Sequence, residues 1–255
     1  MTQPALSVLV LTEDGSDDAH ATLVALLKKL LRRVDDACRT DRIRFDPQGE
    51  AERRYTVANA WKGDGPSDRA SRAAARFRLI DLYRTIATRL LEQDPPGFVV
   101  FHLDGDTTWS NRHTSENVQK FSARIVHHVE LLVEQRDPTR AASAMDRLLP
   151  LVPFYSIEAW LYQNLSEMRG LCAALGDPPE LVAQIGAWTT DRASLDEVAK
   201  IKDQCRLSDR HNRRLAEAAW PAADAEGAGR SFHAAVVRFR GSAELRTALA
   251  ATHGS

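Results

Sequence analysis

The sequence predicts an α/β fold, with a mostly parallel sheet flanked by helices and a helical extension at its C-terminal end. Short apolar runs alternate with longer segments whose apolar residues recur at helical spacing, which favours parallel strands covered on both faces. Two runs, 5–12 and 98–103, are mostly apolar and are followed directly by acidic residues. From residue 177 onward the pattern is helical. We therefore expect residues 1–176 to form the α/β domain and 177–255 to form a helical extension packed on it.

The individual elements follow from local patterns. The helix predicted at 20–34 presents a leucine face and ends in basic residues, which its dipole favours. The stretch 42–60 is ambiguous and holds two short candidate strands. A glycine- and proline-containing loop at 61–66 then precedes an arginine-rich helix. In chain order we expect strands or helices at 5–12, 20–34, 43–45, 55–58, 67–91, 98–103, 115–135 and 148–153, and a helix beginning at Ser156.

Composition restricts the kinds of protein that this chain can be. Its 255 residues carry 34 basic and 35 acidic side chains, and a net charge of −1 argues against a generally basic nucleic-acid coat. The three cysteines lack metal-binding spacing, which favours reduced thiols. There is no apolar run of about 18 residues and no basic start typical of a signal peptide. We expect a cytoplasmic protein without membrane association.

Carboxylates follow both apolar strands, and they are the main indication of function. Glu13 comes directly after the first strand, and Asp104 and Asp106 follow the later one with a single glycine between them. Asp104 and Asp106 share strand parity, so we expect both to point the same way. Ligands in open α/β folds bind at the carboxyl ends of strands, and Mg²⁺ prefers oxygen ligands. The pattern therefore predicts a Mg²⁺ or Mn²⁺ site, although an ordinary solvated Asp-Gly turn explains Asp104 and Asp106 equally well.

Further acids could extend this site. Asp17 and Asp18 stand where the first helix begins, and Glu158 lies in the first turn after the strand at 148–153. Each of the three is also a favourable residue for capping a helix or interacting with its dipole. Two divalent ions held by several carboxylates can activate water and stabilise both oxygens of a phosphodiester displacement. His102 has the parity of the carboxylates and either touches the site or packs in the core.

These residues resemble the TOPRIM domain, which topoisomerases, bacterial primases and nucleases of the OLD (overcoming lysogenisation defect) family share. The family places a glutamate after the first strand with a glycine close by, and Asp-x-Asp after a later strand. The matching residues are Glu13, Gly15, Asp104 and Asp106, with Asp14 inserted between the glutamate and the glycine. The resemblance covers about residues 5–165.

The resemblance implies a metal-dependent DNA or RNA nuclease, with a role in bacterial defence against phage. By analogy with the OLD-family nucleases, Asp17 or Asp18 and Glu158 complete the metal site, and Lys202, or else Lys200, supplies a catalytic lysine. The chain has no phosphate-binding GxxxxGK[ST] loop, so any ATPase control would come from a separate subunit.

Other functions remain open from the sequence alone. The segment 104–108 also fits the first motif of haloacid-dehalogenase-type phosphatases, with Asp104 as nucleophile and Asp106 as general acid/base. That motif normally opens its domain, and this function leaves Glu13 unexplained. A glycosyltransferase with an Asp-x-Asp site is more remote. A third alternative is a non-catalytic TOPRIM-like regulatory subunit that keeps the acids for structure.

Nucleic acid would need a local basic surface on a chain of this charge. The best candidate strip combines Lys62 with the arginine-rich helix, although exposed ion pairs explain those arginines nearly as well. Trp109 follows the Asp-Gly-Asp segment closely enough to stack on a base. The arginines of the strip are Arg69, Arg72, Arg76, Arg78, Arg84 and Arg89.

Overall fold

A parallel sheet forms the centre of the molecule. The computed structural model describes residues 3–13, 16–46, 49, 61–62, 69–187, 190–197 and 207–253. Within these residues the sheet has four strands in the order β2-β1-β3-β4, and every pairing is parallel. The strands are β1 (Leu6–Leu11), β2 (Ile43–Asp46), β3 (Gly97–His102) and β4 (Leu148–Leu151). The predicted α/β fold is confirmed, and the candidate strand at 55–58 lies outside the described residues.

Both faces of the sheet are buried, which explains the continuous apolar runs in the sequence. All residues of β1 and β3 are buried. Val8 and Val10 of β1 point into one hydrophobic core, whereas Leu9 and Leu11 point into a second core on the opposite face. The two cores are therefore separated by the sheet itself.

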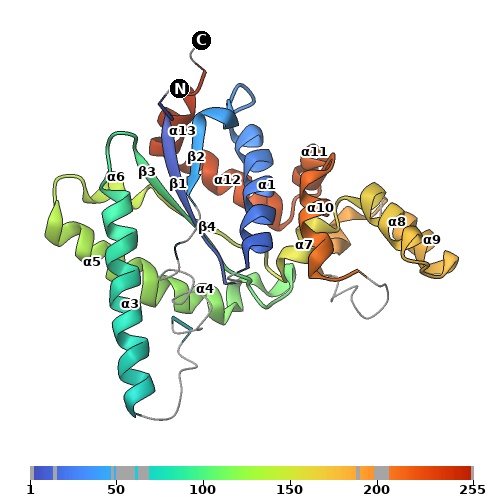
Figure 1. Cartoon of the computed structure of the whole chain (residues 1–255), viewed down its shortest axis with the longest axis horizontal. Helices are drawn as coiled ribbons and strands as arrows, with labels where there is room; N and C mark the ends of the chain where they lie inside the picture. The colour runs from blue at the N-terminus through green and yellow to red at the C-terminus, as the bar shows by residue number, and fades with distance from the viewer. Residues whose placement is uncertain are drawn as a thin grey trace.

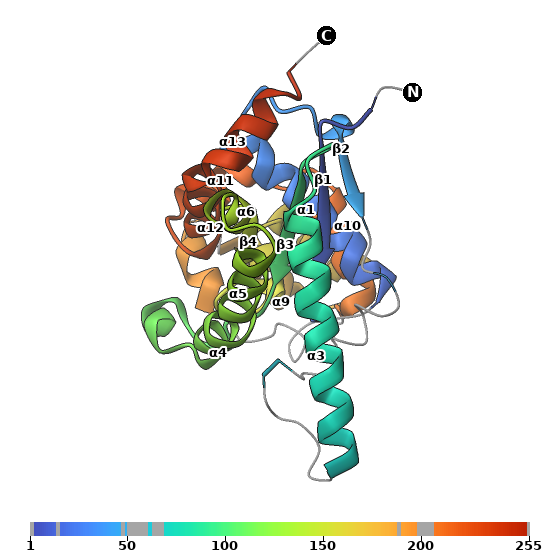
Figure 2. The ribbon, with the colours of Figure 1, turned by 90° about the vertical axis from the view of Figure 1, so that its left-hand side faces the viewer.

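Helices cover each face (Figures 1 and 2). The first core includes leucines of α1 (Asp17–Val34) and aromatic residues of α12 (Ser231–Gly241). The second core lies between the sheet and two helices, α3 (Arg69–Leu90) and α5 (His127–Arg136). The other α-helices of the described residues are α4 (Glu116–Phe121), α6 (Ala141–Met145), α7 (Ile157–Leu161), α8 (Leu165–Ala174), α9 (Pro179–Ala187), α10 (Asn212–Glu217), α11 (Ala222–Gly227) and α13 (Ala243–Ala250).

The first helix shows how closely local sequence sets local structure. The Ser16 hydroxyl accepts a hydrogen bond from the Ala19 N–H at 3.1 Å, which caps the helix. The leucines predicted for its inner face are buried. Because β1 and α1 run in opposite directions, the start of α1 lies at the carboxyl end of the sheet (Figure 1).

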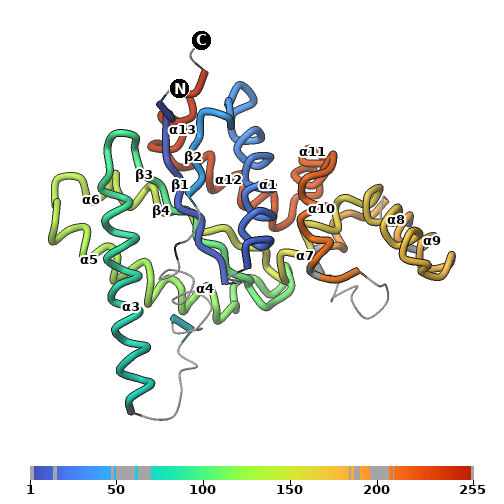
Figure 3. The backbone as a smooth tube through the Cα atoms, viewed as in Figure 1, coloured from blue at the N-terminus to red at the C-terminus, as the bar shows by residue number. Residues whose placement is uncertain are grey.

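Two helical segments differ from a regular α-helix that packs on the sheet along its whole length. The helix predicted at 115–135 is interrupted by a π-helical turn at Ser122–Val126, between α4 and α5. The first half of α3 extends past the carboxyl end of the sheet, as the tube in Figure 3 shows. Exposed side chains, including Phe77, lie on this projecting half.

The C-terminal helices share the first core with the N-terminal strand and helix. Phe239 of α12 and Leu249 of α13 belong to the same buried cluster as Leu27 of α1. Packing of this region on the α/β part agrees with the expected extension, but the division at residue 177 stays a prediction. Cys38 and Cys172 are buried. Among the described helices, none has the length and apolarity needed to cross a membrane.

Candidate functional site

The register of two neighbouring strands brings the predicted acids to one edge of the sheet. Leu11 of β1 pairs with Phe101 of β3, and both strands run in the same direction. The residues that follow them therefore emerge side by side. Thr12 Oγ1 lies 3.1 Å from His102 Nδ1; Glu13 follows Thr12 directly, and Asp104 is two residues after His102. This is the arrangement that the acidic strand ends predicted.

A lysine joins two of the carboxylates. Lys62 Nζ donates to Glu13 Oε2 at 2.9 Å and lies 3.8 Å from Asp106 Oδ2. Burial raises the pKa of Glu13 above its ordinary value; the hydrogen bond and charge of Lys62 and the charge of His102 lower it, and the nearby Asp104 charge raises it further. One ammonium group thus accompanies three carboxylates, and Glu13 is incompletely compensated.

His102 and Asp104 form the buried side of the site. His102 is 4% exposed, and its Nε2 lies 3.4 Å from Asp104 Oδ1. That separation permits charge attraction, but the alignment does not make a hydrogen bond, and neither atom has a hydrogen-bond partner among the described residues. Glu13 Oε1 is a third buried atom without one in the described part of the chain. Unsatisfied buried polar atoms are costly, so their concentration at one place needs an explanation.

The loop after β3, which carries Asp104 and Asp106, packs closely against the segment that follows β4. The Gly105 N–H donates to the Pro153 carbonyl at 2.9 Å, and a Cβ added at Gly105 would lie 2.6 Å from the Phe154 carbonyl oxygen. Asp106 adopts a positive φ of 48°, which is uncommon for a residue with a side chain. Such backbone conformations concentrate at functional sites. Only glycine fits the position between the two aspartates.

The positions of Asp104 and Asp106 correct the expected strand parity. Strand β3 ends at His102, so the alternation of the strand does not continue to Asp106. The Asp104 oxygen faces His102, whereas Asp106 is mostly exposed and accepts a hydrogen bond from Asn117 Nδ2 at 2.6 Å. Both acids still lie at the same edge, but the turn through Gly105 places them there.

Two of the other predicted ligands, Asp18 and Glu158, contact residues of α10, and their part in a metal site stays a prediction. Asp18 is 4.0 Å from Arg213 Nη1 of α10, and Asp17 is in the same exposed first turn of α1. Glu158 is buried in α7, and its Oε1 accepts a 3.5 Å hydrogen bond from Asn212. Lys200 and Lys202 lie outside the described residues. In the part of the chain that the structure describes, no three His, Cys, Asp or Glu side chains are arranged to hold a metal ion.

The structure changes the role expected for Lys62. This residue was predicted to belong to a basic strip that binds nucleic-acid phosphates; in the structure its side chain is 12% exposed and contacts Glu13 and Asp106. No motif marked it as part of the site. Arg89 is mostly covered and forms an ion pair with Asp46 at 2.9 Å. Arg72, Arg76 and Arg84 are exposed, and the first two lie on the half of α3 that projects past the sheet (Figure 1).

Trp109 has packing partners that limit its use as a stacking surface. Its ring makes an edge contact with Phe154 at a centroid distance of 5.4 Å, and the Arg112 guanidinium lies 4.5 Å from the ring centroid. Its proposed stacking on a base stays a prediction.

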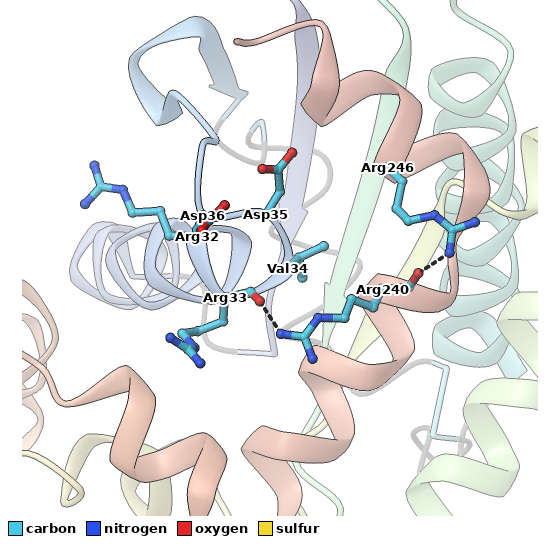
Figure 4. Close-up of a pocket in the computed structure, with 7 residues that line it drawn as sticks. All are labelled: Arg32, Arg33, Val34, Asp35, Asp36, Arg240 and Arg246. Atoms are coloured by element: carbon cyan, nitrogen blue, oxygen red, sulfur yellow. Dashed lines mark hydrogen bonds between the residues drawn. The ribbon is translucent and has the colours of Figure 1, made fainter.

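A surface hollow lies at the opposite, amino end of the sheet. Its volume is about 460 Å³, and Figure 4 shows that it is bordered by the end of α1 together with residues of α12 and α13. The guanidinium groups point in different directions from its rim, and Asp35 and Asp36 lie between them. The lining residues are Arg32, Arg33, Val34, Asp35, Asp36, Arg240 and Arg246.

Comparison with protein-family models, with curated proteins and with solved structures finds no match to this chain. The TOPRIM resemblance therefore stays a prediction that depends on Glu13, Asp104 and Asp106 themselves.

Proposed function

We propose that this protein is a divalent-metal-dependent phosphodiesterase, most specifically a DNA or RNA nuclease. The observation that carries the proposal is the group of three carboxylates, Glu13, Asp104 and Asp106, at the ends of two adjacent parallel strands. The buried oxygens Glu13 Oε1 and Asp104 Oδ1 have no hydrogen-bond partner among the described residues. Hard divalent cations prefer such oxygen ligands, so the residues present fit Mg²⁺ or Mn²⁺.

Each residue of the site has a function in this proposal. Glu13 and Asp104 hold the ion through their buried oxygens, and Asp106 adds a carboxylate from the exposed side. His102 lies beside Asp104, and Asn117 orients Asp106 through its hydrogen bond. Lys62 provides the positive charge that can face a phosphate oxygen. When bound, the metal activates water and stabilises the negative charge of phosphodiester cleavage.

Two further features support nucleic acid as the substrate. Exposed Arg72 and Arg76 lie on the part of α3 that extends past the edge carrying the acids, where they can contact backbone phosphates. The resemblance to TOPRIM nucleases points to the same substrate class. A role in phage defence and a separate ATPase subunit follow from that resemblance alone.

The phosphatase alternative uses the same Asp104 as a nucleophile. In the structure the Asp104 Oδ1 atom is turned toward buried His102, and Glu13 of the neighbouring strand belongs to the same group. A phosphatase site of that type leaves Glu13 without a role. The geometry therefore supports the phosphodiesterase better.

A cleavage assay tests the proposal. Labelled single- and double-stranded DNA and RNA are incubated with the wild-type protein and Mg²⁺ or Mn²⁺, in parallel with Asp104→Asn and a matched control, Asp36→Asn, at the opposite end of the sheet. We expect cleavage by wild type and by the control, and a loss of about 100-fold or more in Asp104→Asn. Cleavage that survives in Asp104→Asn would refute the assignment.

A parallel assay with p-nitrophenyl phosphate separates the alternatives. Hydrolysis of this monoester without nucleic-acid cleavage would establish the phosphatase. Retained Mn²⁺ binding without hydrolysis of any of these substrates would favour the regulatory subunit.

A further inference from the structure

Lys62 is held in place by the residue before it. Trp61 is fully buried and makes edge contacts with Phe101 and Phe121, at centroid distances of 5.9 and 6.3 Å. Its carbonyl accepts a 3.1 Å hydrogen bond from Arg124 Nη1. A lysine attached to such an anchor does not behave as a mobile surface side chain. The fold therefore directs the Lys62 ammonium into the acidic site.

The ammonium stands between two of the carboxylates that the proposed function assigns to the metal. Lys62 Nζ is 2.9 Å from Glu13 Oε2 and 3.8 Å from Asp106 Oδ2. A cation that coordinates both carboxylates needs the space around these oxygens. Two cations this close repel each other strongly in a partly desolvated site.

The same arrangement explains why the acids are not already arranged as ligands. Within the described residues no three potential ligands are grouped for a metal, although Glu13 Oε1 and Asp104 Oδ1 are buried without hydrogen-bond partners. His102 supplies a separate observation, because its buried Nε2 points at Asp104 and also lacks a hydrogen-bond partner in the described chain. The Lys62 ammonium contacts Glu13 and Asp106, whereas the buried Asp104 Oδ1 atom faces His102.

We propose that Lys62 is a built-in competitor of the divalent cation: its ammonium occupies the place between Glu13 and Asp106 and leaves it when the cation binds. This inference rests on the proposed metal site and extends it, since it assigns to one residue of this chain the control of metal affinity. The displaced ammonium stays beside the acids, where it can bind a phosphate oxygen of the substrate.

Calorimetric titration with Mn²⁺ tests the competition. The variants are Lys62→Gln and, as a matched control, Lys29→Gln. Lys29 is also partly buried, but its ammonium donates to the carbonyls of Ala216 and Ala218, both at 2.5 Å, away from the acids. We expect Lys62→Gln to bind Mn²⁺ about tenfold more tightly than wild type or more, and Lys29→Gln to bind as wild type does. Equal or weaker binding by folded Lys62→Gln would overturn the proposal.

A second measurement uses the wild-type protein and does not depend on how the variant folds. Acetylation of lysines by an amine-reactive reagent is followed by mass spectrometry with and without Mn²⁺. Displacement predicts that Mn²⁺ increases the rate at Lys62 several-fold and leaves Lys29 unchanged. An unchanged or slower rate at Lys62 would contradict the inference.

Both measurements record metal binding rather than cleavage, so they separate this inference from the nuclease assignment. Competition without cleavage would retain Lys62 as the competitor in a protein with another function. Cleavage without competition would retain the nuclease and remove this role of Lys62.

Discussion

Two glutamates in different parts of the molecule are each largely covered and each contact basic side chains, but their electrostatic states differ. Glu226, near the arginine-lined hollow, is 2.5 Å from Arg33 Nε and 3.1 Å from Arg240 Nη2. Burial tends to raise the pKa of Glu226, but the two guanidinium groups lower it below its ordinary value. Glu13 has one ammonium partner and another acid nearby, and burial raises its pKa.

The proposed function therefore rests on unsatisfied charge and not on the presence of a pocket. The hollow beside Glu226 is a pocket lined by four arginines, yet the charge of Glu226 is neutralised by two of them. The site around Glu13 combines a carboxylate of raised pKa with buried atoms that lack hydrogen bonds among the described residues. Such combinations are typical of binding and catalytic sites.

The largest expected effect is on the free energy of unfolding. Substituting one glycine in each region tests how tightly the backbone of that region is packed. In Gly105→Ala the new Cβ would lie 2.6 Å from the Phe154 carbonyl oxygen, whereas at Gly241 of α12 no described atom beyond the local helix backbone lies within 4 Å of the Cβ position. We expect Gly105→Ala to lower the free energy of unfolding by about 1–3 kcal/mol. Gly241→Ala should leave it unchanged or raise it by up to about 1 kcal/mol. Urea unfolding of both variants measures the two effects.

The same two variants should also differ in their affinity for Mn²⁺. Moving the Gly105 backbone displaces the acids on either side of it, so Mn²⁺ affinity should fall in Gly105→Ala and stay at the wild-type value in Gly241→Ala. Similar stability in the two variants would show that the loop after β3 is adaptable and would remove the distinction between the regions.

The sequence predicted those parts of the candidate site whose positions follow from the pairing of strands. Glu13 and Asp104 follow apolar runs, and parallel neighbours end at the same edge, so their convergence needed only the correct pairing of β1 with β3. Lys62 could not be found in this way. Its position depends on Trp61 docking against Phe101 and Phe121, and these contacts join segments far apart in the sequence.

The orientation of Asp106 could not be predicted from the sequence, for a different reason. The period of two applies only while the chain is a strand, and β3 ends before Asp104. The turn at Gly105 is set by contact with Phe154, which is also distant in sequence. By contrast, the leucine face and Ser16 cap of α1 are local features, and the structure confirms the helix that they predicted.

A smaller effect is the pH dependence of stability, which should have opposite signs for the two glutamates. A raised pKa means that folded Glu13 binds its proton more tightly than the unfolded chain does, so its contribution is favourable below its ordinary value of 4.5 and is lost as pH rises. The lowered pKa of Glu226 means that its contribution is present above 4.5 and is lost as pH falls.

Urea unfolding of wild type, Glu13→Gln and Glu226→Gln between about pH 3 and pH 7 measures these contributions. As pH rises, the unfolding free energy of wild type relative to Glu13→Gln should fall, and that of wild type relative to Glu226→Gln should rise. Parallel slopes for the two variants would mean that the glutamates are in equivalent environments.

The smallest expected effect concerns Arg246, at the rim of the hollow. Its Nη1 donates to the Arg240 carbonyl at 2.7 Å at an exposed position. Exposed contacts of this kind contribute little, so Arg246→Ala should change the free energy of unfolding by no more than about 0.5 kcal/mol. Because the arginines of the hollow point apart and acids lie between them, calorimetric titration with inorganic phosphate should show no difference between Arg246→Ala and wild type. Phosphate binding that is lost in Arg246→Ala would instead identify the hollow as an anion site, and the contrast between the two ends of the sheet would then be one of ligand type.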